Sequence, residues 1–447
     1  MSDDPLVIEE YLPGRYAVLS DAERWPTLTA EGAARLAAVR HHPAAPRWTH
    51  ATGDRLTAEQ VERTRHPLPT EGWLAEHLAL ARQLIAYRRL PRLERLTDFP
   101  TISRADLAAD VAAFVPLDAD FGRLLHGSSS GATGAALMIP DDVEEVARSF
   151  HLLVDLVTAH GVVWRPDPDR MALVNLVLQH QAFTYASVIS GFGQSTMARI
   201  NLAPAEWPAP GAAADFLAAQ DPQVITGDPS TLAELLRPDL VAAVRPLALF
   251  SGAMELSAPL RARLEEAFGC PVFDVYGLHE TRPIAVRTDD GPFLVLQRRL
   301  VVEILDPAGQ PVPPGEVGEI VVTAGENPLL PLVRYRTGDF ARLVEVDGRP
   351  ALADLEGRAH TRFVAGDGSL VGSVDLTQQL QAHGALGWTV HQDAAGAVTA
   401  RVVEGDARIG EALQALLGRP VQVERVLDLA ALGPGKPRRY RSEAVPQ

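Results

Sequence analysis

The feature that most constrains the fold is an alternation of short apolar runs with helical patterns in the middle of the chain. Four runs have the length and composition of buried strands, namely residues 171–177, 223–226, 247–250 and 272–275. Residues 259–268, between the last two runs, have helical spacing and stop before Gly269, a residue type that often closes helices. Strands that alternate with helices are typical of a parallel sheet covered by helices. The sequence therefore predicts an α/β fold.

The regions on either side of this core extend the prediction. Upstream, residues 142–160 show apolar side chains at helical spacing, with an aspartate available as the N-terminal cap. The first hundred residues are predicted to be helices and loops, with one helix within 73–90. Downstream, apolar runs at 293–297, 300–305 and 319–323 are separated by tight turns, which indicates an antiparallel β unit.

The composition changes near Gly357, which suggests a second domain. Beyond it the sequence predicts a hairpin, a helix and a strand, at residues 388–392 with 398–403, 409–417 and 421–427. A chain of 447 residues also exceeds what one core usually holds. We therefore expect a large N-terminal α/β domain with parallel sheets and a β subdomain over 1–356, beginning with a helical segment over 1–95. A small C-terminal α+β domain is expected over 357–447.

Charge and cysteine content narrow the classes of function. The formal net charge of −16 argues against a nucleic-acid or anionic-membrane partner. Cys270 is the single cysteine, which excludes an intramolecular disulfide and a cysteine-based metal site, and its surroundings predict a buried, inert thiol. No apolar run approaches the roughly 18 residues of a membrane helix, and no N-terminal signal region is visible. We expect a soluble, cytoplasmic protein.

A loop of small residues, Ser-Ser-Ser-Gly-Ala-Thr-Gly-Ala at 128–135, is the first candidate for chemistry. Such a loop can bring backbone N–H groups and hydroxyls close to an anion, although it lacks the lysine and the spacing of a Walker-type phosphate loop. A flexible loop is the structural alternative. Residues 127–131 also match G-x-S-x-G with Ser129 as a nucleophile, but that motif requires a strand, a sharp turn and a helix. Here a predicted strand follows the loop, which favours a hairpin over a serine hydrolase.

Three further stretches contain side chains that are suited to ligand binding or catalysis. Asp-Val-Tyr-Gly-Leu-His-Glu at 274–280 follows a predicted strand, at the usual ligand edge of a parallel sheet, where Tyr276 offers a ring for a flat base and Glu280 a carboxylate for a metal ion. Arg-Tyr-Arg-Thr-Gly-Asp at 334–339 ends in a carboxylate that can accept two hydrogen bonds from a ribose diol. Arg358 and Lys436, each after a glycine, are suitable donors to phosphate.

Each of these residues also has a structural reading, as a core tyrosine, a solvated loop residue, a turn former or a tail charge. Two other motifs are weak. A dinucleotide site at 191–196 lacks its third glycine, and a zinc peptidase site at His279-Glu280 lacks a second histidine at the right spacing. The joint occurrence of the stretches in this order favours a functional reading.

Taken in order, the stretches resemble the adenylate-forming superfamily of acyl-CoA synthetases, adenylation domains and luciferases. Within it, the chain looks most like the branch of phenylacetate–CoA ligase. The resemblance runs from about residue 90 to the end and rests on residues 126–134, 252–255 (Gly-Ala-Met-Glu), 276–280 and 332–339, of which the last is the most specific.

The resemblance implies a two-step ligase. A carboxylate attacks the α-phosphate of Mg·ATP to give an acyl-adenylate and pyrophosphate, and a second nucleophile, often the thiol of coenzyme A, then displaces AMP. It assigns nucleotide contacts to Ser129, Ser130, Gly131, Thr133, Gly134, Gly252, Ala253, Asp274, Tyr276, Gly277 and Asp339. It assigns Mg²⁺ to Glu280, a ribose or phosphate contact to Arg358, and the bridge between carboxylate and α-phosphate to Lys436. The small domain would be mobile and would rotate between the two steps.

The resemblance also suggests an acyl pocket and shows three departures. Phe183, Tyr185, Gly252 and Gly277 are expected to line a pocket for an aromatic acid, with core packing as the structural alternative. Ala135-Ala136 replace the Lys-Pro that usually ends the phosphate loop, 359–361 lack the usual hinge aspartate, and 367–371 do not match a coenzyme A loop. The acceptor therefore stays open between coenzyme A, an amine and a carrier protein. A member that binds nucleotide without turnover and a homodimer both stay open too.

Overall fold

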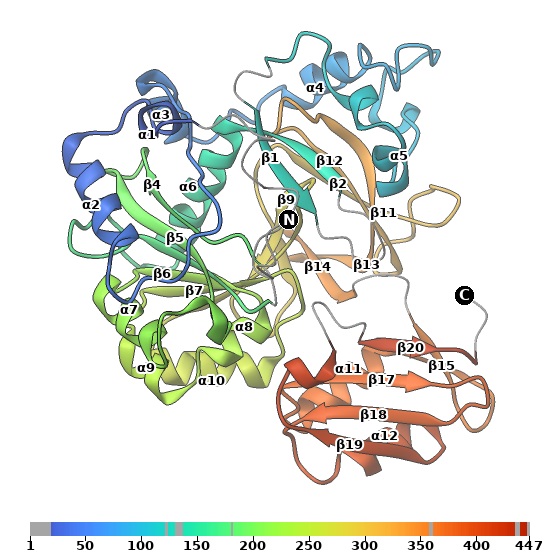
Figure 1. Cartoon of the computed structure of the whole chain (residues 1–447). Helices are drawn as coiled ribbons and strands as arrows, with labels where there is room; N and C mark the ends of the chain where they lie inside the picture. The colour runs from blue at the N-terminus through green and yellow to red at the C-terminus, as the bar shows by residue number, and fades with distance from the viewer. Residues whose placement is uncertain are drawn as a thin grey trace, which may run out of the picture.

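The computed structural model describes residues 19–120, 124–129, 137–179, 182–356, 361–433 and 439–444. Its centre is a 12-stranded sheet in the order β11-β12-β13-β14-β10-β9-β8-β7-β6-β3-β5-β4 (Figure 1). The parallel part consists of β3 (Leu173–Val177), β5 (Ser195–Asn201), β6 (Val224–Gly227), β7 (Ala248–Gly252) and β8 (Val272–Leu278). β4 (Tyr185–Ile189) joins its edge in antiparallel direction. All four predicted strands and the predicted α/β fold are confirmed.

Helices cover both faces of the parallel strands. On one face lie α7 (Ala212–Gln220), α8 (Pro229–Glu234), α9 (Pro238–Ala243) and α10 (Ala258–Phe268), and on the other lies α6 (Val143–Ala159). Alternate residues of β7 point to opposite faces of the sheet. Leu249 packs on the face covered by α10, whereas Phe250 packs on the face covered by α6 and stacks on Phe273 with ring centroids 4.6 Å apart. The predicted helices over 142–160 and 259–268 are confirmed, and Gly269 closes α10 with a φ of 62°.

The antiparallel unit continues the same sheet. It contains β9 (Arg282–Arg287), β10 (Phe293–Val295), β11 (Leu300–Leu305), β12 (Val317–Ala324), β13 (Leu332–Val346) and β14 (Arg349–Glu356). The link is β8, which pairs with β7 in parallel and with β9 in antiparallel direction. Gly277 permits the tight β8–β9 hairpin, since a Cβ there would lie 2.4 Å from the Arg282 carbonyl oxygen. The 15-residue strand β13 and its partner β14 are new relative to the sequence prediction.

Short helices precede the sheet: α1 (Asp21–Arg24), α2 (Ala30–Arg40), α3 (Ala58–Thr64), α4 (Trp73–Ala81) and α5 (Arg104–Ala109). The predicted helix within 73–90 is only partly correct, because α4 ends at Ala81 and turns follow. Leu84 and Tyr87 are each 1% exposed in those turns. Their three-residue spacing is also that of a helical face. In the structure the two side chains belong to one apolar cluster with Phe99, whose ring contacts that of Tyr87.

The C-terminal unit, which we define as residues 361–433 and 439–444, has a core of its own. It contains β15 (Arg362–Val364), β16 (Leu370–Gly372), α11 (Ser373–Ala382), β17 (Gly387–Gln392), β18 (Val398–Val403), α12 (Ile409–Leu417), β19 (Val421–Val426) and β20 (Tyr440–Ser442). Its four-stranded sheet, β19-β18-β17-β20, carries both helices (Figure 1). The predicted hairpin, helix and strand are confirmed, whereas the boundary at 356/357 stays a prediction because 357–360 lie outside the described residues.

The predicted burial of Cys270 is only partly correct, because the residue is half-buried, but burial still raises the pKa of its thiol to about 12, as an unreactive cysteine requires. Among the residues that the structure describes, no helix is both long enough and apolar enough to pass through a bilayer.

Candidate nucleotide-binding site

Two motifs that are 60 residues apart in the sequence meet at the end of β8. The hydroxyl of Tyr276 donates a hydrogen bond to Asp339 Oδ2 at 3.0 Å. In the order of the sheet, β9, β10 and β14 lie between β8 and β13, so the antiparallel strands must curl over to make this contact. Burial and the negative charge of Asp339 raise the pKa of Tyr276 well above its usual value, which keeps the phenol protonated as the donor.

Glu280 makes a second contact between the same motifs. It lies in the turn between β8 and β9, is 6% exposed, and accepts a hydrogen bond from the hydroxyl of Tyr335 at 3.3 Å. Its other partner is Arg104, whose Nη1 lies 2.9 Å from Glu280 Oε1. Arg104 begins α5, and its side chain is 34% exposed. The sequence analysis missed this arginine because no motif surrounds it, and only the tertiary contact identifies it.

The Asp339 carboxylate is held by a bulge in β13. Gly338 adopts a left-handed backbone conformation with a φ of 78°, which glycine reaches without a steric penalty. Thr337 Oγ1 accepts a hydrogen bond from the Asp339 amide at 3.0 Å and donates one to the Ile320 carbonyl at 2.9 Å. The turn before Asp339 is therefore tied to β12, and the carboxylate has a defined position.

A buried ion cluster fixes the Glu280 turn from its other side. Arg282 has a φ of 60°, and its guanidinium lies 2.7 Å from Asp141 Oδ1 and 2.9 Å from Glu145 Oε1. His279 Nε2 lies 3.4 Å from Asp141 Oδ2. Burial raises the pKa of Glu145, against the attraction of Arg282. Because Asp141 is the last but one residue of β2 (Leu137–Asp142) and Glu145 belongs to α6, the cluster joins the Glu280 turn to the strand that follows the serine-rich loop.

The strands on both sides of the serine-rich loop pair with each other, as the sequence predicted, whereas residues 130–136 lie outside the described residues. β1 (Leu124–Ser129) and β2 (Leu137–Asp142) pair in antiparallel direction, and the helix starts only after β2. Ser129 therefore lacks the strand–turn–helix context of a hydrolase nucleophile. Several predicted site residues, namely Ser130, Gly131, Thr133, Gly134, Arg358 and Lys436, lie outside the described residues, as does the side chain of Ser129.

Asp274 does not join the Tyr276–Asp339 pair. It is 2% exposed, and its Oδ2 lies 2.8 Å from Nη2 of Arg287 and 3.9 Å from Nη2 of Arg261. Burial raises the pKa of Asp274 to about 6, although both arginines act in the opposite direction. Since these partners come from β9 and α10, the carboxylate serves as a tie inside the sheet.

Gly252 and Ala253 are placed beside β8. Gly252 ends β7 and pairs with Val275, and a Cβ at this position would meet only the Val275 carbonyl at 3.6 Å. Ala253 has a φ of 68°, which is uncommon for a residue with a side chain and marks a constrained turn. The loop after β7 and the end of β8 thus form adjacent parts of one sheet edge.

The structure separates the two aromatic residues of the expected acyl pocket from its two glycines. The rings of Phe183 and Tyr185 lie 5.7 Å and 6.2 Å from the ring of His50. Tyr185 belongs to β4, and four strands stand between β4 and β8. At the usual strand spacing this corresponds to about 24 Å along the sheet. The cause is the position of β4, which follows β3 in the chain but is placed outside β5.

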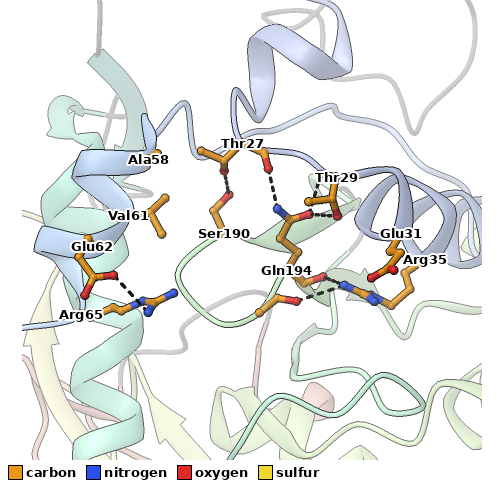
Figure 2. A pocket seen from close by; sticks show the side chains of 11 residues that line it. Thr27, Thr29, Glu31, Arg35, Ala58, Val61, Glu62, Arg65, Ser190 and Gln194 are labelled. Atoms are coloured by element: carbon orange, nitrogen blue, oxygen red, sulfur yellow. Dashed lines mark hydrogen bonds and ion pairs between the residues drawn. The ribbon is translucent and has the colours of Figure 1, made fainter.

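One cavity, of about 430 Å³, lies elsewhere (Figure 2). It is lined by Thr27, Thr29, Glu31, Arg35, Ala58, Val61, Glu62, Arg65, Ser190, Gly193 and Gln194. The Gln194 side chain is hydrogen-bonded to the backbone beside the cavity. Its Nε2 donates to the Thr27 carbonyl at 2.6 Å, and its Oε1 accepts from the Thr29 amide at 2.9 Å. The cavity is at the start of β5, opposite the edge that carries Tyr276, and its two acids balance its two arginines. The edge that carries Tyr276 and Asp339 is therefore the candidate site.

Comparisons with known proteins point the same way. A family model described as "AMP-binding enzyme" matches residues 101–327, slightly more than half of the chain. The phenylacetate-coenzyme A ligase of Pseudomonas putida is 34% identical over 121 residues, which cover 25% of this chain and 27% of that protein. The ligase of the same name from Thermus thermophilus is 30% identical over 165 residues, which cover 34% and 35%. The alignments thus span between about a quarter and a third of these relatives.

Solved structures extend the likeness in fold to most of the chain. The crystal structure of 2-hydroxyisobutyryl-CoA ligase in the postadenylation state, in complex with 2-HIB-AMP, matches with a TM-score of 0.61. It is 18% identical, and the match covers 85% of this chain and 92% of that one. At this identity, the match supports the fold.

Proposed function

Because the chain belongs to the AMP-binding enzyme family, we propose that it is an ATP-dependent, AMP-forming ligase. It activates a carboxylic acid as an acyl-adenylate with release of pyrophosphate, and then transfers the acyl group to coenzyme A or another nucleophile. The observation that carries the proposal is the 3.0 Å contact between Tyr276 and Asp339, which joins two predicted nucleotide motifs beside Glu280.

Tyr276 and Asp339 suit the nucleoside. The ring of Tyr276 would stack on adenine, and Asp339 would accept hydrogen bonds from the ribose diol. The hydrogen bond between them fixes the distance between base and sugar contacts before ATP arrives, which lowers the entropy cost of binding. Gly252, Ala253 and Gly277 would flank the base from the adjacent strand ends.

Glu280 and Arg104 suit the phosphates. Mg²⁺ in nucleotide sites is commonly held by one or two carboxylates together with substrate phosphates. The site fits this pattern, since Glu280 is a single carboxylate and no group of three metal-binding side chains occurs in the described part of the chain. The bound ion would offset phosphate charge. Arg104, already 2.9 Å from Glu280, would supply a cation near the phosphates, where Ala135-Ala136 replace the usual Lys-Pro.

The remaining roles follow the sequence motifs. Ser129, Ser130, Gly131, Thr133 and Gly134 would donate to the phosphates. Lys436 would stabilise charge between the carboxylate and the α-phosphate, and Arg358 would reach the ribose or a phosphate. The C-terminal unit would move between the two half-reactions. We expect Lys436→Ala to reduce adenylation by orders of magnitude while ATP still binds, and near-normal adenylation in this variant would refute the assignment.

The acid and the acceptor follow from the curated relatives. Their shared name, phenylacetate-coenzyme A ligase, supports an aromatic acid and coenzyme A for this chain as well. The unmatched region at 367–371 leaves an amine or a carrier-protein thiol as alternative acceptors to be compared in the same assay.

The test is pyrophosphate release with Mg·ATP and a panel of aryl and aliphatic acids, with hydroxylamine as a surrogate acceptor. Release that depends on one acid would support adenylation and identify the acid. Coenzyme A and amines are then compared as acceptors with that acid. ATP binding measured by calorimetry, together with an absence of release for every acid, would instead favour a nucleotide-binding member without turnover.

A further inference from the structure

The C-terminal unit is attached to the large domain through the loop that follows β7. In this loop, Glu255 Oε1 accepts a hydrogen bond from Gln381 Nε2 of α11 at 3.0 Å, and the Glu255 carboxylate forms an ion pair with Arg439. Arg439 Nη2 also donates to the backbone carbonyl of Glu255 at 2.8 Å. One residue of the large domain thus binds two residues of the C-terminal unit, through its side chain and its backbone.

Arg439 is fixed within the C-terminal unit. Its guanidinium lies over the ring of Trp388 at 4.6 Å, and Trp388 is 1% exposed in the core of that unit. The carbonyl of Arg439 accepts a hydrogen bond from the Val390 amide at 2.6 Å, directly before β20. A planar cation that is stacked on a ring loses little freedom when it binds a carboxylate.

The loop around Glu255 connects the proposed nucleotide site with this contact. It begins at Gly252 and Ala253, which would flank the base. It ends at Ser257, whose Oγ donates to the Leu386 carbonyl of the C-terminal unit at 2.9 Å. Leu386 is 7% exposed and belongs to the same apolar cluster as Leu256. The proposed nucleotide contacts and the contacts with the C-terminal unit are therefore only a few residues apart in one short loop.

A second ion pair between the two parts provides an internal comparison. Arg263 Nη1 of α10 lies 2.6 Å from Glu404 Oε1, with side-chain exposures of 45% and 56%. The corresponding exposures for Arg439 and Glu255 are 20% and 30%. Exposed ion pairs contribute little to stability. We therefore expect the Glu255–Arg439 pair to contribute more to the binding between the two parts than the Arg263–Glu404 pair does.

We propose that Glu255 is a positioning residue. Its contacts with Arg439 and Gln381 hold the C-terminal unit in the arrangement used for acyl-adenylate formation, and they must break before the second half-reaction. The inference rests on the proposed function, because Lys436, the proposed catalytic cation, precedes Arg439 by three residues in the chain. Because three residues of chain span at most about 11 Å, the position of Arg439 limits the distance between Lys436 and the loop that follows β7.

The test compares the half-reactions in Glu255→Gln and in the matched control Glu404→Gln. The first half-reaction, which forms the acyl-adenylate, is followed as acid-dependent exchange of pyrophosphate into ATP, with phenylacetate or the best acid of the panel. The second half-reaction, which transfers the acyl group, is followed as AMP release from the chemically prepared adenylate of that acid after coenzyme A is added. We expect E255Q to slow the exchange about tenfold and leave the second step at least as fast as in the wild type. E404Q should change neither step by more than about twofold.

A double-mutant cycle identifies the partner. Arg439→Gln should resemble E255Q, and the double variant should be no slower than R439Q alone, because both changes remove one contact. R439Q also replaces E255Q if the latter does not fold by circular dichroism. Equal slowing of both half-reactions in E255Q, or an equal loss in E404Q, would overturn the proposal.

Backbone hydrogen exchange keeps the inference separate from the proposed function. Amides of residues 252–260 should exchange faster in folded E255Q than in the wild type and in E404Q. Unchanged protection would overturn the role of Glu255. Absence of pyrophosphate exchange in the wild type with every acid would refute the proposed function, while the amide exchange would still decide whether Glu255 holds the C-terminal unit.

Discussion

Asp274 and Glu280 come from one stretch of sequence, but the structure uses them differently. Both carboxylates are buried, with exposures of 2% and 6%. Asp274 pairs with Arg261 and Arg287, whose side chains are 4% and 15% exposed, whereas Glu280 pairs with Arg104, whose side chain is 34% exposed. Burial alone therefore does not distinguish a structural carboxylate from a candidate site residue. The accessibility of the partner does, because only an accessible partner can be exchanged for a ligand.

The largest expected effect is on catalysis at Glu280. Glu280→Gln removes the carboxylate charge and keeps the shape, so we expect adenylation to fall by roughly 10²–10³-fold, with a small change in stability. The measurement is acid-dependent pyrophosphate release at saturating Mg·ATP, with urea unfolding as the control for stability. A variant that keeps wild-type turnover would show that Glu280, like Asp274, is structural.

The second prediction concerns stability at Asp274. Burial raises the pKa of its carboxyl from 3.8 to about 6, so between these pH values the folded state holds a proton that the unfolded state has lost. The free energy of unfolding should therefore fall as the pH rises from about 4 to about 6, by an amount on the order of 3 kcal/mol from this group. Asp274→Asn should lack this contribution.

The Asp274 measurement is urea unfolding of the wild type and D274N at several pH values between 4 and 7. The difference between the two curves isolates the group from other buried carboxyls. The folded variant should keep its turnover within about threefold, since Asp274 contacts no proposed substrate. Parallel curves, or a loss of turnover as large as that of E280Q, would contradict the comparison.

A smaller effect is expected for nucleotide binding at Asp339. Asp339→Ala removes the acceptor of the Tyr276 hydrogen bond and the proposed ribose contact, so the Kd for ATP should rise about tenfold. Calorimetry checks this, with Asp354→Ala as a control, because Asp354 pairs with Arg342 on the neighbouring strand. Unchanged affinity in D339A would remove the ribose role.

The smallest effect is expected at Tyr335. Burial and the charge of Glu280 raise the pKa of this phenol, so its hydroxyl stays protonated near neutral pH and donates to Glu280. Tyr335→Phe removes one hydrogen bond, and we expect turnover to fall about threefold. The same kinetic assay as for E280Q applies. A loss as large as that of E280Q would mean that the hydroxyl contacts the reactants directly.

Local patterns in the sequence were sufficient for most elements. The strands β6, β7 and β8, the helices α6 and α10 and the pairing of β1 with β2 follow from apolar periodicity, capping residues and turn residues, all of which act over a few positions. The helix predicted within 73–90 is only partly correct because Leu84 and Tyr87 pack in turns although their spacing is also that of a helix. The aromatic pocket stays a prediction, and no local signal in the sequence records that β4 lies at the edge of the sheet.

The sequence by itself determined the α/β class and pointed to Tyr276, Glu280 and Asp339, because residue types in a fixed local order carry that information. The tertiary structure decided which residues meet: it joined Tyr276 to Asp339, brought Arg104 to Glu280, enclosed Asp274 between two arginines and placed Glu255 against Arg439. These contacts depend on how a 12-stranded sheet curls and on how separate cores pack. Such long-range geometry is a property of the whole chain and leaves no mark in a short stretch of sequence.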